Sequence, residues 1–415
     1  MARKMKDSGI KWIGEIPEEW EVGRIGQLYT ERKEKVSDID YPPLSVTMKG
    51  ILPQLSTAAK TDAHDDRKLV RKGDFAINSR SDRRGSCGIS AFDGSVSLIN
   101  IILTPRGEMH PFFFEWLFHS TMFSAEFYKW GHGIVDDLWT TNWQDMKKIF
   151  VPMPPLEEQQ RIADFLDKKC AAIDEAVDKT RASIEEYKKL KQSLITQAVT
   201  KGLRPHRPMK DSKSIWFGSI PSNWNMEKIK YLFKIKKDIA GEEGHTVLSI
   251  TQKGIIPKDL TKNEGQLAEN YINYQLVNIG DFAMNHMDLL TGWVDISSHN
   301  GVTSPDYRVF VISDKLKCSS KYYLYVMQMC YFNRIFYGLG QGVSGLGRWR
   351  LQADKFLNFY VPIPPHAEQQ EITDYLDKKT AEIDALVAKK EALAKELEAY
   401  KKSLIYEYVT GKASL

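Results

Sequence analysis

Three arginines close together are the side chains in this sequence best suited to binding an anion. Arg80, Arg83 and Arg84 lie within residues 78–85, a stretch that begins with Asn78. A guanidinium group can clamp a phosphate, or meet O6 and N7 of guanine with two parallel hydrogen bonds. The same composition would suit a solvated basic loop, and the spacing alone leaves both interpretations open.

A second stretch, residues 285–292, matches the first in its terminal Asn and Gly but differs inside, where His286 and Met287 replace the basic residues. Such residues could contact a DNA groove or serve as packing. Lys49 and Lys253 occupy matched positions before a glycine, and Arg348 and Arg350 follow a glycine-rich stretch. The candidate DNA-binding residues are therefore Lys49, Asn78, Arg80, Arg83, Arg84, Lys253, Asn285, His286, Arg348 and Arg350.

No residues have the spacing of a catalytic, cofactor or metal site. The glycine-rich turn at 337–342 opens no convincing βαβ unit, and neither a phosphate-binding loop nor the Asn/Asp-Pro-Pro-aromatic tetrapeptide of an amino-methyltransferase is present. The nine histidines show no metal-ligand spacing, and the four cysteines form no Cys-x-x-Cys pair. We expect a chain that is not an enzyme and binds no metal or cofactor itself, with any catalysis supplied by a partner.

The composition is that of an ordinary globular protein, with 42% hydrophobic and 27% charged residues among 415. No apolar run approaches the roughly 18 residues of a membrane span, and the N-terminus leads into no apolar signal core. We therefore expect a cytoplasmic protein without a membrane partner. The net charge of +4 permits a polyanionic partner without requiring one.

The sequence contains an internal repeat. Residues 12–20 (Trp-Ile-Gly-Glu-Ile-Pro-Glu-Glu-Trp) return as 216–224 (Trp-Phe-Gly-Ser-Ile-Pro-Ser-Asn-Trp), and Val-Pro-Met-Pro-Pro at 151–155 returns as Val-Pro-Ile-Pro-Pro at 361–365. A period of about 200 residues is too long for a solenoid unit and indicates a domain with an appendage. Duplication and fusion account for this most simply, and suggest a target that also has two similar halves.

Two kinds of element are expected to hold these residues. Residues 7–150 and 211–360 contain short apolar runs broken by turn residues, with helices at 112–128 and 321–337, which predicts mixed α/β domains. Residues 156–200 and 366–412 have apolar residues at 3-and-4 spacing after a Pro-Pro pair, which predicts two helices of roughly 65 Å packed antiparallel as a coiled coil.

The predicted fold class is therefore α+β, with two similar mixed domains joined by two long antiparallel helices and a pseudo-twofold internal repeat. The predicted boundaries are 1–155 for the first domain, 156–200 for the first helix, 201–210 for a linker, 211–365 for the second domain and 366–412 for the second helix.

Several of these motifs resemble those of one known family. Pro-Pro-Leu-Glu-Glu-Gln-Gln-Arg-Ile-Ala-Asp-Phe-Leu-Asp-Lys-Lys at 154–169, its echo at 364–379, and the two Trp-x-Gly-x-Ile-Pro-x-x-Trp openings resemble the specificity subunit of type I restriction-modification systems. The resemblance spans nearly the whole chain. It implies a non-catalytic DNA reader in which each domain is a target recognition domain for one half of a split, asymmetric site.

The resemblance also implies partners. The paired helices would set the gap between half-sites and bind two methyltransferase subunits, which would carry S-adenosylmethionine. Restriction subunits would add ATP- and Mg²⁺-dependent translocation and cleavage. The family-matched residues Gln159, Gln160, Gln369 and Gln370, near the helix starts, are candidates for partner binding, although solvation of the helix surface explains them equally well.

Two alternative functions remain. The chain could be a coiled-coil scaffold whose globular ends bind proteins. It could also be a self-sufficient methyltransferase, which the missing motifs argue against.

Overall fold

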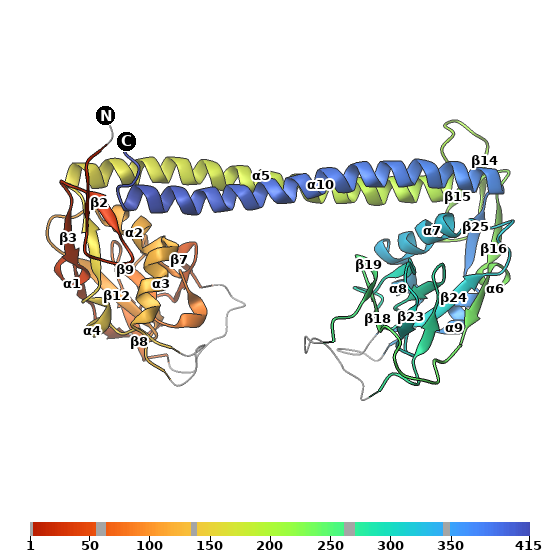
Figure 1. Cartoon of the computed structure of the whole chain (residues 1–415), viewed down its shortest axis with the longest axis horizontal. Coiled ribbons are helices and arrows are strands. Elements are labelled where there is room, and N and C mark those ends of the chain that lie inside the picture. The colour runs from red at the N-terminus through yellow and green to blue at the C-terminus, as the bar shows by residue number, and fades with distance from the viewer. Residues whose placement is uncertain (1–2, 55–63, 134–138, 261–269, 343–348) are drawn as a thin grey trace. The chain divides into compact units, whose positions relative to one another are not determined.

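The computed structural model shows two compact units, and describes all residues except 1–2, 55–63, 134–138, 261–269 and 343–348. Unit 1 comprises Met1–Arg181 together with Glu391–Leu415, and unit 2 comprises Ala182–Lys390. Both contain a globular block and parts of two long helices, which are labelled α5 and α10 in Figure 1.

The globular block of unit 1 is built mainly from short antiparallel strands. The strands are β1 Met5–Asp7, β2 Glu15–Pro17, β3 Glu21–Arg24, β4 Tyr29–Glu31, β5 Lys35–Val36, β6 Leu44–Thr47, β7 Gly50–Pro53, β8 Arg67–Val70, β9 Phe75–Asn78, β10 Cys87–Ile89, β11 Gly94–Ser97, β12 Asn100–Pro105 and β13 Phe150–Met153. The helices of the block are α1 Ile25–Leu28, the 3-10 turn η1 Ser81–Arg83, α2 Pro111–His119, α3 Thr121–Lys129 and α4 Trp143–Met146.

A four-stranded sheet with the order β10-β9-β12-β4 forms the centre of this block, beside a three-stranded sheet with the order β11-β8-β5. Strand β9 is buried on both faces. Its Phe75 and Ile77 belong to the main core, whereas Ala76 between them packs in a second cluster with Leu44 and Val96. This alternation follows from the two-residue period of a strand, and it explains why β9 is apolar throughout.

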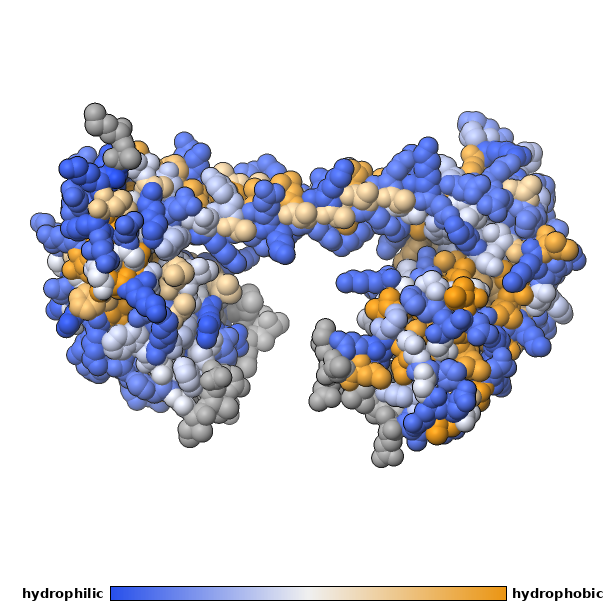
Figure 2. All heavy atoms as spheres, in the orientation of Figure 1, coloured by the Kyte–Doolittle hydropathy of each residue, from blue (hydrophilic) through white to orange (hydrophobic). Residues whose placement is uncertain are grey.

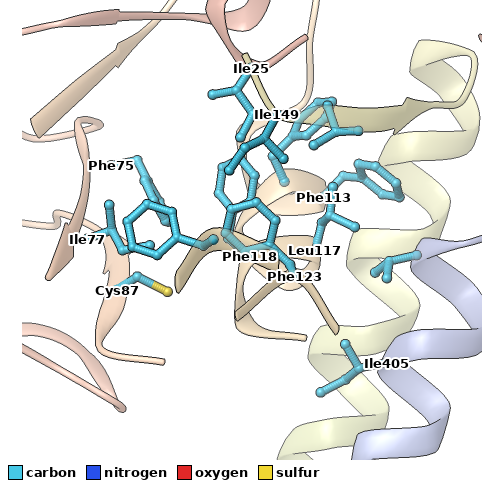
Figure 3. Close-up of a cluster of buried hydrophobic side chains, with 14 of the residues drawn as sticks. Ile25, Phe75, Ile77, Cys87, Phe113, Leu117, Phe118, Phe123, Ile149 and Ile405 are labelled. Carbon is cyan, nitrogen blue, oxygen red and sulfur yellow. The ribbon is translucent and has the colours of Figure 1, made fainter. Parts of the chain in front are cut away.

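The main core of unit 1 is rich in aromatic side chains (Figure 3). Phe118 of α2 lies between Phe75 of the sheet and Phe123 of α3, with ring centroids 5.0 and 4.5 Å away. Helix α2 begins at Pro111, a residue suited to a first helical position because its fixed φ fits the helix and no N–H is lost there. Figure 3 also shows Ile405, which belongs to α10.

Unit 2 repeats this plan. Its strands are β14 Met209–Asp211, β15 Ser219–Pro221, β16 Asn225–Lys228, β17 Phe233–Lys236, β18 Leu248–Thr251, β19 Gly254–Pro257, β20 Gln275–Val277, β21 Phe282–Met284, β22 Val294–Ile296, β23 Gly301–Thr303, β24 Arg308–Ile312 and β25 Tyr360–Ile363. Its shorter helices are α6 Ile229–Leu232, α7 Ser320–Phe332, α8 Ile335–Leu339 and α9 Ala353–Leu357. The sheet order β17-β24-β21-β22 corresponds to β4-β12-β9-β10 of unit 1, which confirms the predicted repeat.

The shared sequence Gly-Asp-Phe-Ala has a structural cause. Asp74 accepts a hydrogen bond from the backbone N–H of Arg71 at 2.8 Å and pairs with Arg32 at 2.7 Å. In unit 2, Asp281 accepts from the backbone N–H of Asn278 at 2.9 Å and pairs with a lysine of β17 at 2.6 Å. Each aspartate therefore holds the turn that enters β9 or β21.

The long helices are α5, Leu156–Lys201, with 46 residues, and α10, His366–Val409, with 44 residues. Both begin directly after a Pro-Pro pair, as predicted. In unit 1, Asp174 pairs with Lys401 at 2.6 Å and Arg181 pairs with Glu398. In unit 2, Tyr187 lies under Lys390, and Lys191 pairs with Asp384 at 2.7 Å. Within each unit the helices are thus antiparallel, which confirms the predicted arrangement.

The core of each unit includes the end of a helix that follows the other globular block. In unit 1, Leu404, Ile405 and Val409 of α10 pack with the N-terminal half of α5. In unit 2, the corresponding contribution comes from Ile195, Ala198 and Val199 of α5. The boundary between the units therefore falls inside both helices rather than at their ends.

A matched cluster joins each helix start to its domain. Trp20 donates through Nε1 to Glu158 at 2.9 Å, and Trp224 donates to Glu368 at the same distance. Arg3 and Arg207 lie over the indole rings and pair with the same two carboxylates. Both tryptophans are fully buried. We call each set of tryptophan, glutamate and arginine a clasp.

Burial opposes ionisation of Glu368, but hydrogen bonds from Arg207 and Trp224 outweigh this and keep the pKa of Glu368 below its usual value.

Hydrophilic residues cover much of the visible face of each unit (Figure 2). Among the described residues, no helix is both long enough and apolar enough to span a membrane.

Candidate nucleic-acid interface

The arginine-containing loop of unit 1 starts from a fixed position at the end of β9. Asn78 accepts a hydrogen bond through Oδ1 from the backbone N–H of Arg80 at 3.1 Å, and its carbonyl accepts from the hydroxyl of Tyr128 at 3.0 Å. Asn78 itself is buried. It therefore shapes the loop, and the residues that follow it carry the exposed charge.

The three arginines of this loop differ in their surroundings. The side chain of Arg80 is 35% exposed and lies 3.2 Å from Asp82, while that of Arg83 is 68% exposed and lies 3.8 Å from the same aspartate. Arg84 is exposed, with its guanidinium 5.5 Å from the centroid of the Tyr128 ring. One carboxylate thus faces two guanidinium groups, which leaves the loop with a positive charge suited to an anionic partner.

This loop borders a cavity of about 640 Å³. The residues that line it are Leu44, Ser45, Val46, Thr47, Met48, Gln54, Arg67, Asn78, Asp82, Arg83, Arg84, Ser86, Ser97, Ile99 and Asn100. Of the residues predicted from the sequence, the cavity brings together Asn78, Arg83 and Arg84. It also includes Arg67 and Asn100, which the sequence did not suggest because each lies at the start of a strand, where strand pairing decides what the side chain faces.

Lys49 and Lys253 lie in equivalent exposed hairpin turns. The backbone N–H of Lys49 donates to Oγ1 of Thr47 at 3.0 Å, and that of Lys253 donates to Oγ1 of Thr251 at 3.1 Å. The glycine that follows each lysine has a positive φ, 95° for Gly50 and 108° for Gly254, which explains why glycine is needed there. Both turns present a lysine side chain to solvent.

The corresponding loop of unit 2 starts in the same way. Asn285 accepts through Oδ1 from the backbone N–H groups of Met287 at 3.2 Å and Asp288 at 3.3 Å. Its carbonyl accepts from the hydroxyl of Tyr331 at 2.7 Å. A tyrosine thus braces the asparagine in both units, and Tyr128 of α3 and Tyr331 of α7 are each the last residue but one of their helix.

His286 is partly buried beside two arginines. Burial, followed by the charges of Arg308 and Arg350, lowers its pKa to about 3. Its imidazole is therefore neutral near pH 7. Arg350 forms a short backbone bridge with Gln341, at 2.9 and 3.0 Å, and Arg348 lies outside the described residues.

Arg308 is a further residue of this site that the sequence did not suggest. It is 5% exposed, donates through Nη2 to the carbonyl of Leu351 at 2.9 Å, and lies 4.8 Å from the ring centroid of Phe356. Its Nη1 is buried and has no hydrogen-bond partner among the described residues. An arginine at the start of an otherwise apolar strand was the available signal, because the matched residue of unit 1 is Ile101.

The four glutamines near the helix starts fall into two classes. Gln159 is buried, accepts from the backbone N–H of His110 at 2.8 Å and donates to the carbonyl of Pro154 at 2.8 Å. Gln369 is likewise buried and makes the same kinds of bond to Ser319, Lys317 and Pro364. Gln160 and Gln370 are exposed and donate to an aspartate one turn later. Partner binding by these glutamines stays a prediction.

Nothing in the described part of the chain has the geometry of a metal site, since no three His, Cys, Asp or Glu side chains gather there. The Cys87 thiol lies 3.7 Å from Nδ1 of His119. Burial raises the pKa of Cys87 and lowers that of His119 to about 4. Both groups are therefore neutral near pH 7, unlike the thiolate of an activated nucleophile.

Comparison with known proteins identifies the family. The model of the type I restriction modification DNA specificity domain matches the chain twice, at residues 17–186 and 221–396. The chain is 26% identical to the specificity subunit of the type I restriction enzyme MjaVIII of Methanocaldococcus jannaschii, over 96% of this chain and 93% of that protein. It is 22% identical to the putative MjaX specificity subunit of the same organism, over 96% and 95%.

Solved structures share the fold. A chain from a study of complex assembly and conformational transition in a type I restriction-modification system matches with a TM-score of 0.69 at 14% identity, over 96% of this chain and 99% of that one. The HsdS subunit from Thermoanaerobacter tengcongensis matches with a TM-score of 0.51 at 15% identity, over 96% and 98%. The two family matches, together with full-length relatives, show that this chain belongs to the type I restriction-modification DNA specificity family and is a specificity subunit of such a system.

Proposed function

We propose that each unit reads one half of a bipartite, asymmetric site in double-stranded DNA. The observation that carries this proposal is the contrast between the two loops after β9 and β21. Both begin with an asparagine held by a tyrosine hydroxyl, yet one continues with arginines and the other with a neutral histidine beside a buried arginine. Equivalent frames with different exposed chemistry suit two unlike half-sites.

Reading of one half-site by unit 1 would use the exposed Arg83 and Arg84 and the hairpin residue Lys49. In unit 2 the corresponding contacts would come from Lys253, His286 and Arg350. Lysine and arginine contacts to phosphates would place each unit on the duplex, and the loop residues nearest the base edges would select the sequence. The affinity for DNA should therefore fall steeply as the salt concentration rises.

The same proposal gives α5 and α10 two roles. Together they would set the number of base pairs between the half-sites, and their exposed faces would bind two methyltransferase subunits. Support comes from the length of the helices, 46 and 44 residues, which exceeds what a domain core needs. Gln160 and Gln370 are the exposed glutamines available for such contacts.

In this proposal the chain directs catalysis that its partners perform. The methyltransferase subunits would carry S-adenosylmethionine for adenine methylation. Restriction subunits joining the complex would use ATP and Mg²⁺ for translocation and cleavage.

Footprinting tests the bipartite proposal. Methylation-sensitive sequencing of the host genome, with and without this gene, would first identify the recognised site. The chain, purified with its methyltransferase partners, should then protect two blocks of that site, separated by an unprotected or weakly protected gap. A single protected block would contradict the proposal, and loss of all protection with the methyltransferase still bound would favour a protein scaffold.

A further inference from the structure

The cavity beside the arginine loop of unit 1 contains a buried acceptor without a donor. Asn100, at the start of β12, is 4% exposed and lines the cavity. Its Nδ2 donates to the carbonyl of Ser97 at 3.0 Å, whereas its Oδ1 is buried and accepts a hydrogen bond from none of the described residues. Rotating the amide by half a turn would place two oxygens together, so the carbonyl of Ser97 fixes which way the amide points.

A buried donor lines the same cavity. Arg67, at the start of β8, is 6% exposed and donates through Nε to Oγ of Ser95 at 2.9 Å and through Nη2 to its carbonyl at 3.0 Å. Among the described residues, no carboxylate forms an ion pair with it. Ser95 occupies Nε and Nη2, so Nη1, which donates to no described residue, is the group left to donate to a ligand in this cavity.

In unit 2 the equivalent positions are aromatic. The backbone N–H of Asn78 donates to the carbonyl of Ser86 at 2.9 Å, and that of Asn285 donates to Trp293 in the same way, which makes Ser86 and Trp293 equivalent. The pairing of β12 with β9, compared with that of β24 with β21, matches Asn100 with Tyr307. The pairing of β8 with β11, compared with that of β20 with β23, matches Arg67 with Tyr274.

Large aromatic side chains therefore stand in unit 2 where unit 1 has a serine, an asparagine and an arginine. Trp293 packs between two apolar clusters of unit 2, with its ring 6.0 Å from that of Tyr331. The small Ser86 leaves the matching space beside Asn78 open. The lining of the cavity thus differs between two copies of one fold at only a few side chains.

We propose that this cavity receives the edge of a DNA base in the half-site of unit 1, with Asn100 accepting from the base and Arg67 donating to it. The inference rests on the proposed DNA-reading function. A phosphate offers only acceptors and would leave Oδ1 of Asn100 unpaired. In the major groove adenine presents an amino donor beside its N7 acceptor, whereas cytosine presents only a donor, and guanine and thymine present only acceptors. The cavity therefore selects adenine.

The neighbouring arginines complete the site. Arg83 and Arg84 line the cavity and are exposed, so their side chains can reorient quickly as DNA approaches. Contacts from these two residues to phosphates would position the duplex, while Asn100 and Arg67 at the base of the cavity would discriminate between bases.

Selection from a randomised duplex library tests the proposal, using the full chain purified with its methyltransferase partners. Wild type should select two blocks of sequence. Asn100→Leu should relax the adenine preference at one position of one block and weaken binding to the wild-type sequence by about tenfold or more. Ser86→Trp should fill the cavity and change the same block.

The other block, read by unit 2, is the internal control in each selection, and melting temperatures report folding. The inference is overturned if Asn100→Leu and Ser86→Trp both select the wild-type blocks with affinities within twofold of wild type. It is also overturned if Asn100→Leu weakens binding equally to all sequences and lowers the salt dependence, because that result indicates a phosphate contact. Failure of wild type to select two blocks would instead refute the bipartite function.

Discussion

A single asparagine fixes the start of each variable loop. The Oδ1 atoms of Asn78 and Asn285 accept from backbone N–H groups two residues further along, at 3.1 and 3.2 Å. Such a side-chain turn constrains the backbone without using the side chains that follow. The interior residues of the loop can therefore change chemistry while the turn itself is kept.

Replacing Arg80, Arg83 and Arg84 together with alanine should weaken binding at the half-site of unit 1 by tenfold or more, because each lost contact to a base or phosphate costs about 1 to 3 kcal/mol. Titrations against duplexes altered in one half-site at a time measure this. Sequence preference at the other half-site should stay unchanged.

The control for the arginine variant removes three positive charges elsewhere in unit 1. Lys33, Lys129 and Lys148 have exposed side chains outside the loop, and their replacement by alanine gives the same change in net charge. Equal relaxation at both half-sites by the arginine variant, or an equal effect of the lysine variant, would contradict the assignment.

His286 should make the stability of unit 2 depend on pH. Its pKa of about 3 in the folded chain lies below the usual 6.5, so the unfolded chain binds more protons between these values. The free energy of unfolding has its full value above pH 6.5 and falls as the pH falls. At pH 5 the loss due to His286 is about 2 kcal/mol.

Urea unfolding at pH 7 and pH 5 measures this contribution. His286→Gln should lose less stability than wild type on acidification, whereas the matched change at the exposed His366 should behave as wild type. An unchanged pH dependence in His286→Gln would show that the histidine is not the titrating group.

At the scale of elements, each clasp explains why widely separated motifs recur together. The second tryptophan of the opening motif and the glutamate of the helix start meet in one hydrogen bond, through Trp20 and Glu158 or Trp224 and Glu368. The buried indole N–H of each opening motif therefore depends on the glutamate of the helix start for its hydrogen bond. The clasp therefore fixes where the first turn of each long helix lies on its own domain.

Replacing Glu368 with alanine should destabilise unit 2 by about 3 to 5 kcal/mol, because it leaves the Arg207 charge and the indole N–H without their partner. Glu158→Ala should cost less, since the glutamate side chains are 7% exposed at Glu368 and 14% exposed at Glu158. Chemical unfolding measures both.

The lowered pKa of Glu368 adds a pH test of the clasp. Its contribution to stability is present above the unfolded pKa and is lost as pH falls below it. The exposed Glu371, which pairs with Arg204 at 3.1 Å, is the control on the same helix. Its replacement by alanine should cost at most about 1 kcal/mol; a similar cost at Glu368 would refute the importance of the clasp.

For the whole molecule, the two helices should act together as the spacer. Inserting seven residues after Arg181 and seven after Lys390 lengthens both helices where the compact units divide. Seven helical residues add about 10 Å, or roughly three base pairs of duplex. We expect the preferred gap between half-sites to increase by about three base pairs.

Selection from duplexes with a randomised gap length measures this change. An insertion into α5 alone should abolish bipartite binding, because the pairs Asp174–Lys401 and Lys191–Asp384 could not both form. An unchanged gap in the doubly lengthened chain would remove the spacer role.

Much of this architecture was predictable because its signals are local. A Pro-Pro pair and a run of apolar residues at helical spacing determine where α5 and α10 begin and how they pack. The repeat was visible because Trp20 and Trp224 lie in nearly identical motifs. Pairing of the helices then followed from their length.

The candidate site was less predictable. Arg67, Asn100 and Arg308 lie at strand starts, and strand register, a tertiary property, determines what they face. Arg67 follows two aspartates and has the local appearance of a solvated turn residue, although it is buried. Gln159 gave no sign of burial because its partners, His110 and Pro154, are provided by the fold.

Completion of the unit 1 core by the last turns of α10 has a consequence for synthesis. Leu404, Ile405 and Val409 leave the ribosome after the whole of Ala182–Lys390, at about 5 to 20 residues per second. The nascent first domain therefore waits on the order of 10 to 40 seconds with part of its apolar core uncovered. During that interval the exposed apolar surface favours aggregation, and a chain truncated in its second half has a first domain whose core is never closed.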